Sequence, residues 1–177
     1  MVRYKDDPEV EGLLLNYLHF YGSYEYIGNS RRWYRREIRI VRPNIGVHSW
    51  GDAQGFRIKG KKLRVKPVDA KVHHYGWVKP PEIQQLKQKH FNKFWHSDEW
   101  VDRHVGPECE YDYMQGGALK IFDGTHPAVM QGRVLRQHWN FKYDPAKVRR
   151  PLKEIILDWI ESLCGWRIGE YKNYRLM

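Results

Sequence analysis

The chain has 177 residues with a formal net charge of +10, and 41% of its residues are hydrophobic, so it can form one domain, or one domain with an appendage, around a core. Only Cys109 and Cys164 are present, which excludes a disulfide scaffold, and no apolar run approaches the ~20 residues that span a bilayer. We therefore expect a cytoplasmic protein, with peripheral attachment to the inner face of the membrane as an alternative.

The positive charge is concentrated in one segment. Between Arg31 and Lys79, fourteen Lys and Arg side chains face only three carboxylates, Glu37, Asp52 and Asp69. Such a segment predicts an anionic partner, which could be a phosphate, nucleic acid or an anionic membrane. For any single basic residue, a solvated strand face is the simpler interpretation.

The first half of the chain predicts strands. The apolar run Val10 to Phe20 favours a buried strand, and residues 21–29 favour a loop. Alternation from Trp33 to Val41 predicts a strand with one core face and one basic face. The segment 59–62 predicts a basic turn, and the following strand, which reaches His74, is expected to break at Pro67.

After Pro80 the apolar period changes to that of a helix. We predict helices from Pro81, after a Ser97 N-cap, over 128–139, and over 151–164 with a stop at Gly165. Residues 1–79 are thus expected to form a strand-rich part and residues 80–177 a helical region packed on it.

The junction between these two parts gathers chemistry-bearing side chains. His73 and His74 are adjacent, so on a strand they point to opposite faces. Either imidazole could bind a metal or a phosphate. The alternative is that one histidine lies in the core and the other on the surface, with no role in binding.

Two other readings of the chain remain open. Asp52 lies in a glycine-flanked loop among basic residues, where a carboxylate can serve as a general base, although a Gly-Asp pair is more often a turn. The basic and aromatic segment 31–36 could bind nucleic acid, but no RNA- or DNA-binding motif accompanies it.

Several phrases of the sequence are distinctive when taken together. They are Glu11-Gly12-Leu13 with His19 to Ser23, Trp33 to Arg39, Asp52 to Arg57, His74 to Pro81, Gly124 to Pro127, and Glu170 to Tyr174. In these phrases the chain resembles the C-terminal, acceptor-side part of bacterial family 2 glycosyltransferases with a GT-A fold. More distantly, it is similar to glucosyltransferases that decorate the lipopolysaccharide core.

The resemblance implies a nucleotide-sugar-dependent transferase that uses a divalent metal, Mg²⁺ or Mn²⁺. It assigns the catalytic base to Asp52, with Glu37 as the second candidate, and it assigns contact with the metal or the pyrophosphate to His74. The acceptor would be a saccharide or another component of the cell envelope.

The resemblance also implies groups that hold the donor. Arg35, Arg36 and Lys79 would bind phosphate or the departing diphosphate, whose developing charge needs fixed positive groups. Tyr75 and Trp77 would pack on a sugar face.

The fold implied is α/β, or α+β in this shortened form, with a partial GT-A-like mixed sheet and a helical C-terminal region. The donor-binding half of the family, with its Asp-x-Asp motif, has no counterpart in the chain. We therefore expect catalysis only if a separate donor-binding chain or a homodimer completes the site. A non-catalytic module that binds glycans or anionic surfaces is the alternative, and a nucleic-acid-binding protein is the less favoured third.

Overall fold

The computed structural model describes residues 4–51, 55–105 and 109–177. Contacts group the chain into two units: unit 1 comprises Met1–Leu18, Tyr34–Val72 and Leu152–Met177, and unit 2 comprises His19–Trp33 and His73–Pro151. The boundaries fall inside two long strands, so each strand contributes to both units. The units are described separately below.

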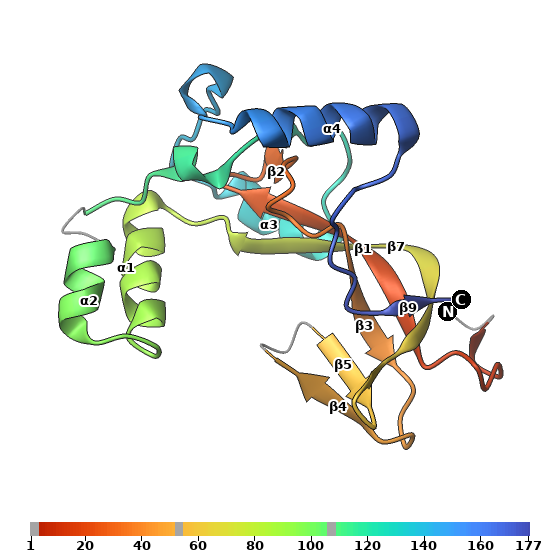
Figure 1. The fold of residues 1–177 in the computed structure, drawn as a ribbon. Helices are drawn as coiled ribbons and strands as arrows, with labels where there is room; N and C mark the ends of the chain where they lie inside the picture. Colours follow the sequence, from red (N-terminus) through yellow and green to blue (C-terminus); the bar gives the residue numbers. More distant parts are fainter. Residues whose placement is uncertain (1–3, 52–54, 106–108) are drawn as a thin grey trace. The chain divides into compact units, whose positions relative to one another are not determined.

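The chain contains both strands and helices throughout its described residues, as expected for the α/β class (Figure 1). The strands are β1 (Gly12–Tyr21), β2 (Tyr26–Gly28), β3 (Arg36–Val41), β4 (Val47–Trp50), β5 (Gly55–Ile58), β6 (Lys61–Lys62), β7 (Arg64–Trp77), β8 (Leu119–Ile121) and β9 (Arg175–Leu176). The helices are α1 (Pro81–Asn92), α2 (Asp98–His104), α3 (Ala128–Leu135) and α4 (Leu152–Cys164), with the short 3₁₀ turns η2 (Tyr113–Gly116) and η3 (Pro145–Lys147).

Unit 1 is built on the first part of β1. This strand pairs antiparallel with β3, and Leu14 lies opposite Ile38. Both side chains are buried with Leu63 and Val65 in one apolar cluster. The predicted strand at Val10 to Phe20 is confirmed as β1, which spans Gly12–Tyr21 and contributes Leu14 to this cluster.

Unit 1 also contains a small antiparallel sheet of three strands in the order β4-β5-β6. The loop between Ile58 and Lys61 has two residues, Lys59 and Gly60, with φ of 49° and 75°. Two successive positive φ values give the turn that matches the twist of a two-residue hairpin. The predicted basic turn is thus confirmed as a hairpin.

β7 is continuous through Pro67, so the predicted break there is wrong. Its partner β9 pairs in parallel only with Arg64 and Val65, and β9 therefore ends before the proline. A proline is tolerated in a strand where its missing N–H is not required by a ladder partner. The sheet is mixed, since it combines this parallel pair with the antiparallel β1–β3 pair.

Unit 2 has a core of aromatic rings. Tyr21, Trp33, Tyr113, Leu119 and Phe141 are buried against one another. The short strand β2 joins this core by pairing with β1 and β8, although residues 21–29 were expected to be a loop. The pairing depends on residues 119–121, which lie almost a hundred positions later in the sequence.

α1 and α2 form an antiparallel helical pair in unit 2 (Figure 1). The predicted N-cap of α2 is confirmed, because Ser97 Oγ accepts a hydrogen bond from Trp100 N–H at 3.3 Å. α1 is also confirmed, but it turns Gln84 and Gln85 inward and leaves its apolar residues exposed.

The last two helices differ in how well the sequence predicts them. α3 ends at Leu135, four residues earlier than expected. α4 matches its prediction, and Gly165 ends it with φ of 67° while its N–H donates to Glu161 O at 2.8 Å. In the described ranges of the chain, none of the helices combines the length and apolarity that crossing a membrane requires.

Candidate functional site

The end of β7 carries two faces of different chemistry within unit 2. His73 and Tyr75 share one face, with ring centroids 6.4 Å apart and nearly parallel planes. His74 points to the other face, where its ring meets that of His19 edge-on at 5.4 Å. The two adjacent histidines therefore face opposite ways, as strand alternation predicts.

Tyr75 forms a hydrogen-bonded pair with a histidine from another part of unit 2. Its hydroxyl lies 2.8 Å from His126 Nδ1, and Phe20 stacks on its ring at 4.6 Å. Burial, followed by the charge of Tyr24, raises the pKa of Tyr75 to about 12. The hydroxyl therefore stays protonated near neutral pH and acts as a hydrogen-bonding group.

His126 makes the stability of unit 2 sensitive to acid. Burial and then the neighbouring His73 lower the pKa of His126, while a backbone hydrogen bond with Tyr24 opposes that shift. The unfolded chain binds the imidazole proton of His126 more readily than the folded chain. The free energy of unfolding therefore decreases as pH falls below the ordinary histidine pKa of about 6.5.

We expect the melting temperature of the wild type to fall more between about pH 7.5 and 5.5 than that of His126→Gln. Differential scanning calorimetry at both pH values measures the two slopes. Equal slopes would show that His126 does not contribute to this pH dependence.

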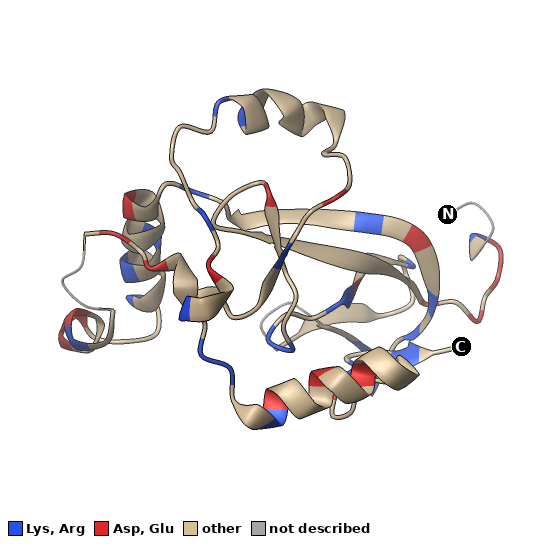
Figure 2. Ribbon diagram, turned by 90° about the horizontal axis from the view of Figure 1, so that it is seen from above, with Lys and Arg blue, Asp and Glu red and all other residues tan. Residues whose placement is uncertain are grey.

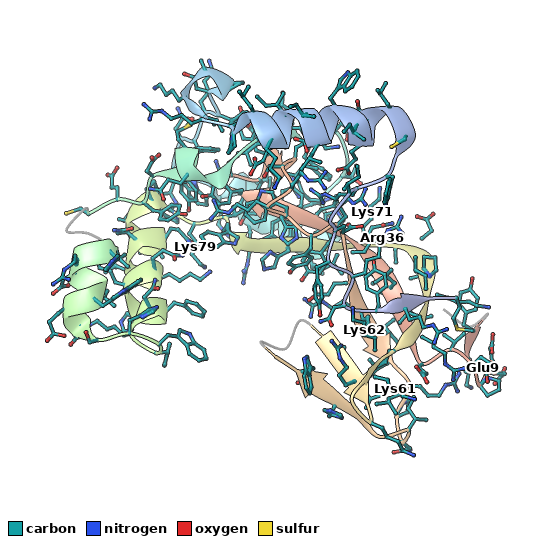
Figure 3. All side chains as sticks on the ribbon, in the orientation of Figure 1. Glu9, Arg36, Lys61, Lys62, Lys71 and Lys79 are labelled. Carbon is teal, nitrogen blue, oxygen red and sulfur yellow. The ribbon has the colours of Figure 1, made fainter. Side chains whose placement is uncertain are left out.

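Trp77, the last residue of β7, lies close to Lys87 of α1. Lys87 Nζ lies 5.4 Å from the Trp77 ring centroid and donates to Gly76 O at 2.8 Å. Burial, followed by the charge of Lys79, lowers the pKa of Lys87. Lys79 lies between β7 and α1 (Figure 3), and its carbonyl accepts a hydrogen bond from Tyr113 at 2.8 Å. Tyr75 and Trp77 have different ring partners: Tyr75 packs on Phe20 and Trp77 on Tyr21, which are neighbours on β1 and face opposite ways, so the structure does not gather the predicted residues at one place.

An open groove of about 690 Å³ lies beside Trp77 in the same unit. Trp77, Trp100 and Tyr111 line it with aromatic rings, and the Trp77 and Tyr111 centroids are 6.0 Å apart. Four side-chain amides share the lining: Gln85, Gln88, Asn92 and Gln115. The groove thus combines aromatic surfaces with groups that can both donate and accept hydrogen bonds.

The charged side chains of the groove balance one another. Arg32 and Arg103 are opposed by Glu110 and Asp112, so with His104 neutral the formal charge of the lining is zero. A groove for a phosphate chain would need an excess of positive groups. This balance favours a neutral, hydroxyl-rich ligand over a polyanion.

Arg35 is bound within unit 1. Its guanidinium donates to both carboxylate oxygens of Glu170, at 3.1 and 3.0 Å, and to Glu161 at 2.9 Å. Burial would raise the pKa of Glu170, but the hydrogen bond and charge of Arg35 and the charges of Arg167 and Lys172 lower it. Arg36, the first residue of β3, is exposed (Figure 3).

Other basic residues of the segment 31–79 also have acidic partners from outside that segment. Arg64 forms ion pairs with Glu9 and Glu11, and Lys66 pairs with Asp7 at 3.4 Å. Part of the positive charge that looks unbalanced in the sequence, at Arg35, Arg64 and Lys66, is therefore balanced inside unit 1.

Of the two candidate bases, Glu37 and Asp52, the structure describes only Glu37. Glu37 is only 5% exposed on β3 and pairs with Arg39, which also donates to the Tyr17 hydroxyl at 2.6 Å. Burial, followed by the charge of Glu37, raises the pKa of Tyr34. Asp52 lies outside the described residues.

The described residues do not fit the divalent metal implied by the resemblance. Among them, no group of three or more His, Cys, Asp or Glu side chains is placed to hold an ion. His74 has another imidazole, His19, as its ring neighbour, whereas Mg²⁺ and Mn²⁺ prefer oxygen ligands.

Comparison of the chain with protein-family models, with curated proteins and with solved structures found no match. The site is therefore defined by its geometry alone. Sequence reasoning missed the pairing of His126 with Tyr75 and the grouping of amides around Trp77. The sequence signal for the first was the distinctive phrase Gly124 to Pro127, and for the second the glutamines at 85 and 88.

Proposed function

We propose that this chain is a glycosyltransferase-related protein with a partial GT-A-like fold, in which the groove of unit 2 binds the saccharide acceptor. The groove carries the proposal, because it combines the rings of Trp77 and Tyr111 with four side-chain amides at zero net formal charge. Sugar rings stack their C–H faces on aromatic side chains, and their hydroxyls pair with planar amides and carboxylates.

The remaining roles of the transferase rest on the resemblance. The resemblance matches Asp52 to the base that deprotonates the acceptor hydroxyl, and it implies a nucleotide-sugar donor with Mg²⁺ or Mn²⁺. His74 and Lys79 of unit 2 would meet the diphosphate, and the resemblance matches Arg36, in unit 1, to phosphate binding as well. A separate donor-binding chain or a second copy would supply the missing ligands.

A non-catalytic glycan-binding module would use the same groove, so this second candidate is separated from the first by donor binding. A nucleic-acid-binding function is less consistent with the charge-balanced groove and with the ion pairs of Arg35, Arg64 and Lys66.

Saccharide binding is tested by saturation-transfer NMR of the full chain with a panel of neutral oligosaccharides. We expect Trp77→Ala and Gln88→Ala each to weaken binding about tenfold, since each removes one surface or amide of the groove. Trp95→Ala is the matched control, because Trp95 is 73% exposed and does not line the groove. Equal loss in the control, or the absence of any saccharide signal, would contradict the proposal.

Donor binding is tested by calorimetry with nucleoside-diphosphate sugars and Mn²⁺ or Mg²⁺. Heat of binding would support a transferase that binds its own donor. Saccharide binding without donor heat would leave the chain an acceptor-binding module that requires a separate donor-binding chain.

A further inference from the structure

A second pocket of unit 2, with a volume of about 300 Å³, is lined by two stretches of the chain, residues 24–26 and residues 121–134. The pairing of β2 with β8 brings these stretches together, because Tyr26 lies opposite Ile121. One position further on, the Phe122 N–H donates to Glu25 O at 2.8 Å. Among the described residues, the lining of this pocket and the lining of the groove beside Trp77 have no member in common.

Aromatic rings form the walls of this pocket. Tyr24, Tyr26, Phe122 and His126 line it. The plane of the His126 ring makes angles of 84° with that of Tyr24 and 49° with that of Phe122, at centroid distances of 5.8 and 5.1 Å. Rings inclined to one another in this way form the sides of a box, and the face of an aromatic ring attracts a cation.

The rings of the pocket are held in place by the packing behind them. Tyr24 is only 8% exposed, and its ring packs on that of Tyr75 at 5.5 Å. Phe122 meets the fully buried Phe20 edge-on at 4.8 Å. A ligand therefore finds the walls already ordered, which reduces the entropy lost on binding.

The charge of the pocket has the opposite sign to that of the whole chain. The chain has a formal net charge of +10, and Figure 2 shows Lys and Arg spread along the ribbon. Among the described residues of the lining, Glu25 carries the only formal charge when His126 is neutral. Burial and then the neighbouring His73 lower the pKa of His126, so its ring is uncharged near neutral pH. The lining thus has a single negative charge.

The charged residues that are nearest in sequence leave this carboxylate uncompensated inside the pocket. Lys120 and Asp123 have opposite signs and lie outside the lining. Arg133 and Arg136, in α3 and at its C-terminal cap, are also absent from the lining. The guanidinium of Arg136 lies beside Gly132, within 3.9 Å of the position that a Cβ there would take.

The apolar part of the lining indicates which kind of cation fits. Ile121, Phe122 and Val134 offer no hydrogen-bond acceptor from their side chains. A primary ammonium would lose hydrogen bonds to water against these surfaces, which costs free energy. A quaternary ammonium has no N–H group, and its methyl groups gain from contact with rings and aliphatic side chains.

Other classes of ligand fit the pocket less well. An anion would be repelled by Glu25. A saccharide would find none of the side-chain amides that line the groove, because the described lining here contains neither Asn nor Gln.

We propose that this pocket binds a small quaternary ammonium compound of the choline type, with its methyl groups against Tyr24 and Phe122 and the Glu25 carboxylate as its counter-ion. The proposal does not depend on the proposed transferase function. It gives unit 2 a second ligand of different chemistry from that of the groove.

The test is an NMR titration of the full chain that follows the methyl signal of choline by saturation transfer. Two further probes separate charge from shape. One is the neutral analogue of choline in which carbon replaces the charged nitrogen, and the other is ethanolamine, which has the same chain with a primary ammonium. We expect choline to bind at least about tenfold more tightly than either, since only choline combines the charge with the methyl groups.

Two variants test the assignment of residues. Glu25→Gln should weaken choline binding about tenfold, because it removes the counter-ion and keeps the shape of the side chain. Phe122→Leu should weaken it about fivefold, because it removes the ring and keeps an apolar side chain. Glu25 is exposed, so its substitution should leave the fold intact, which thermal unfolding of each variant checks.

Asp123→Asn is the matched control for Glu25→Gln. It removes the same charge from an exposed residue beside Phe122 that does not line the pocket, so choline binding should stay within about twofold of the wild type.

Four results would overturn the assignment. They are the absence of a choline signal, equal binding of the neutral analogue, equal binding of ethanolamine, and an equal loss of binding in Glu25→Gln and Asp123→Asn. The second would identify an apolar pocket without charge selectivity, and the third a general site for ammonium groups.

Discussion

Phe20→Ala is expected to lower the free energy of unfolding by about 3–5 kcal/mol, the usual cost of removing a fully buried phenylalanine. Phe20 is 0% exposed and stacks on Tyr75 with centroids 4.6 Å apart. Phe122 meets it edge-on at 4.8 Å, and His126 lies 5.0 Å away. The substitution would leave a cavity among rigid rings that cannot collapse into it, so little of the loss would be recovered.

Urea unfolding followed by tryptophan fluorescence measures this effect, and Phe94→Ala is its matched control. Phe94 is 77% exposed, so the same substitution there should change the free energy of unfolding by less than about 0.5 kcal/mol. A loss below about 1.5 kcal/mol for Phe20→Ala would show that the rings around Phe20 are not a rigidly packed part of the protein.

The parts of the fold that the sequence predicts are those whose causes are local. The apolar run of β1, the Ser97 cap of α2 and the Gly165 stop of α4 each depend on a few neighbouring residues. β2 could not be predicted in this way, because three residues become a strand only when Leu119–Ile121 pairs with them.

α1 shows a different limit of pattern reading. Apolar spacing predicts the helix correctly but does not tell which side faces the protein. Gln84 is 0% exposed, while Leu86 is 57% exposed. Gln85 is held inward because its amide donates to Val105 O at 3.0 Å. That partner is twenty residues away and leaves no trace in the periodicity of the helix.

The candidate site was predictable only along one strand. Strand alternation predicts the opposite directions of His73 and His74, because that property depends only on neighbouring residues of β7. His126 lies fifty-one positions after the Tyr75 hydroxyl that it contacts. The acidic partners of Arg35 are more than a hundred positions away, so the sequence overstated the field that this arginine offers to a phosphate.

Asp52→Asn is expected to lower turnover about 10²–10⁴-fold, the usual contribution of a general base, while binding of the donor is kept. The reason is that an amide cannot accept the proton of the attacking hydroxyl, although it retains the shape of the carboxylate. The measurement is transfer from a nucleoside-diphosphate sugar to a saccharide acceptor, in the presence of whichever chain supplies donor binding. Retained turnover would remove Asp52 as the base.

Glu37→Gln is the companion variant, because it separates a base from a structural carboxylate. The Glu37 side chain is buried and pairs with Arg39, so its loss should lower the free energy of unfolding by about 2–3 kcal/mol. That range is below the largest cost of breaking a buried pair, since Arg39 is 40% exposed and water can solvate it. Turnover per folded molecule should change much less than in Asp52→Asn. A variant that folds with full stability and loses turnover would instead make Glu37 the base.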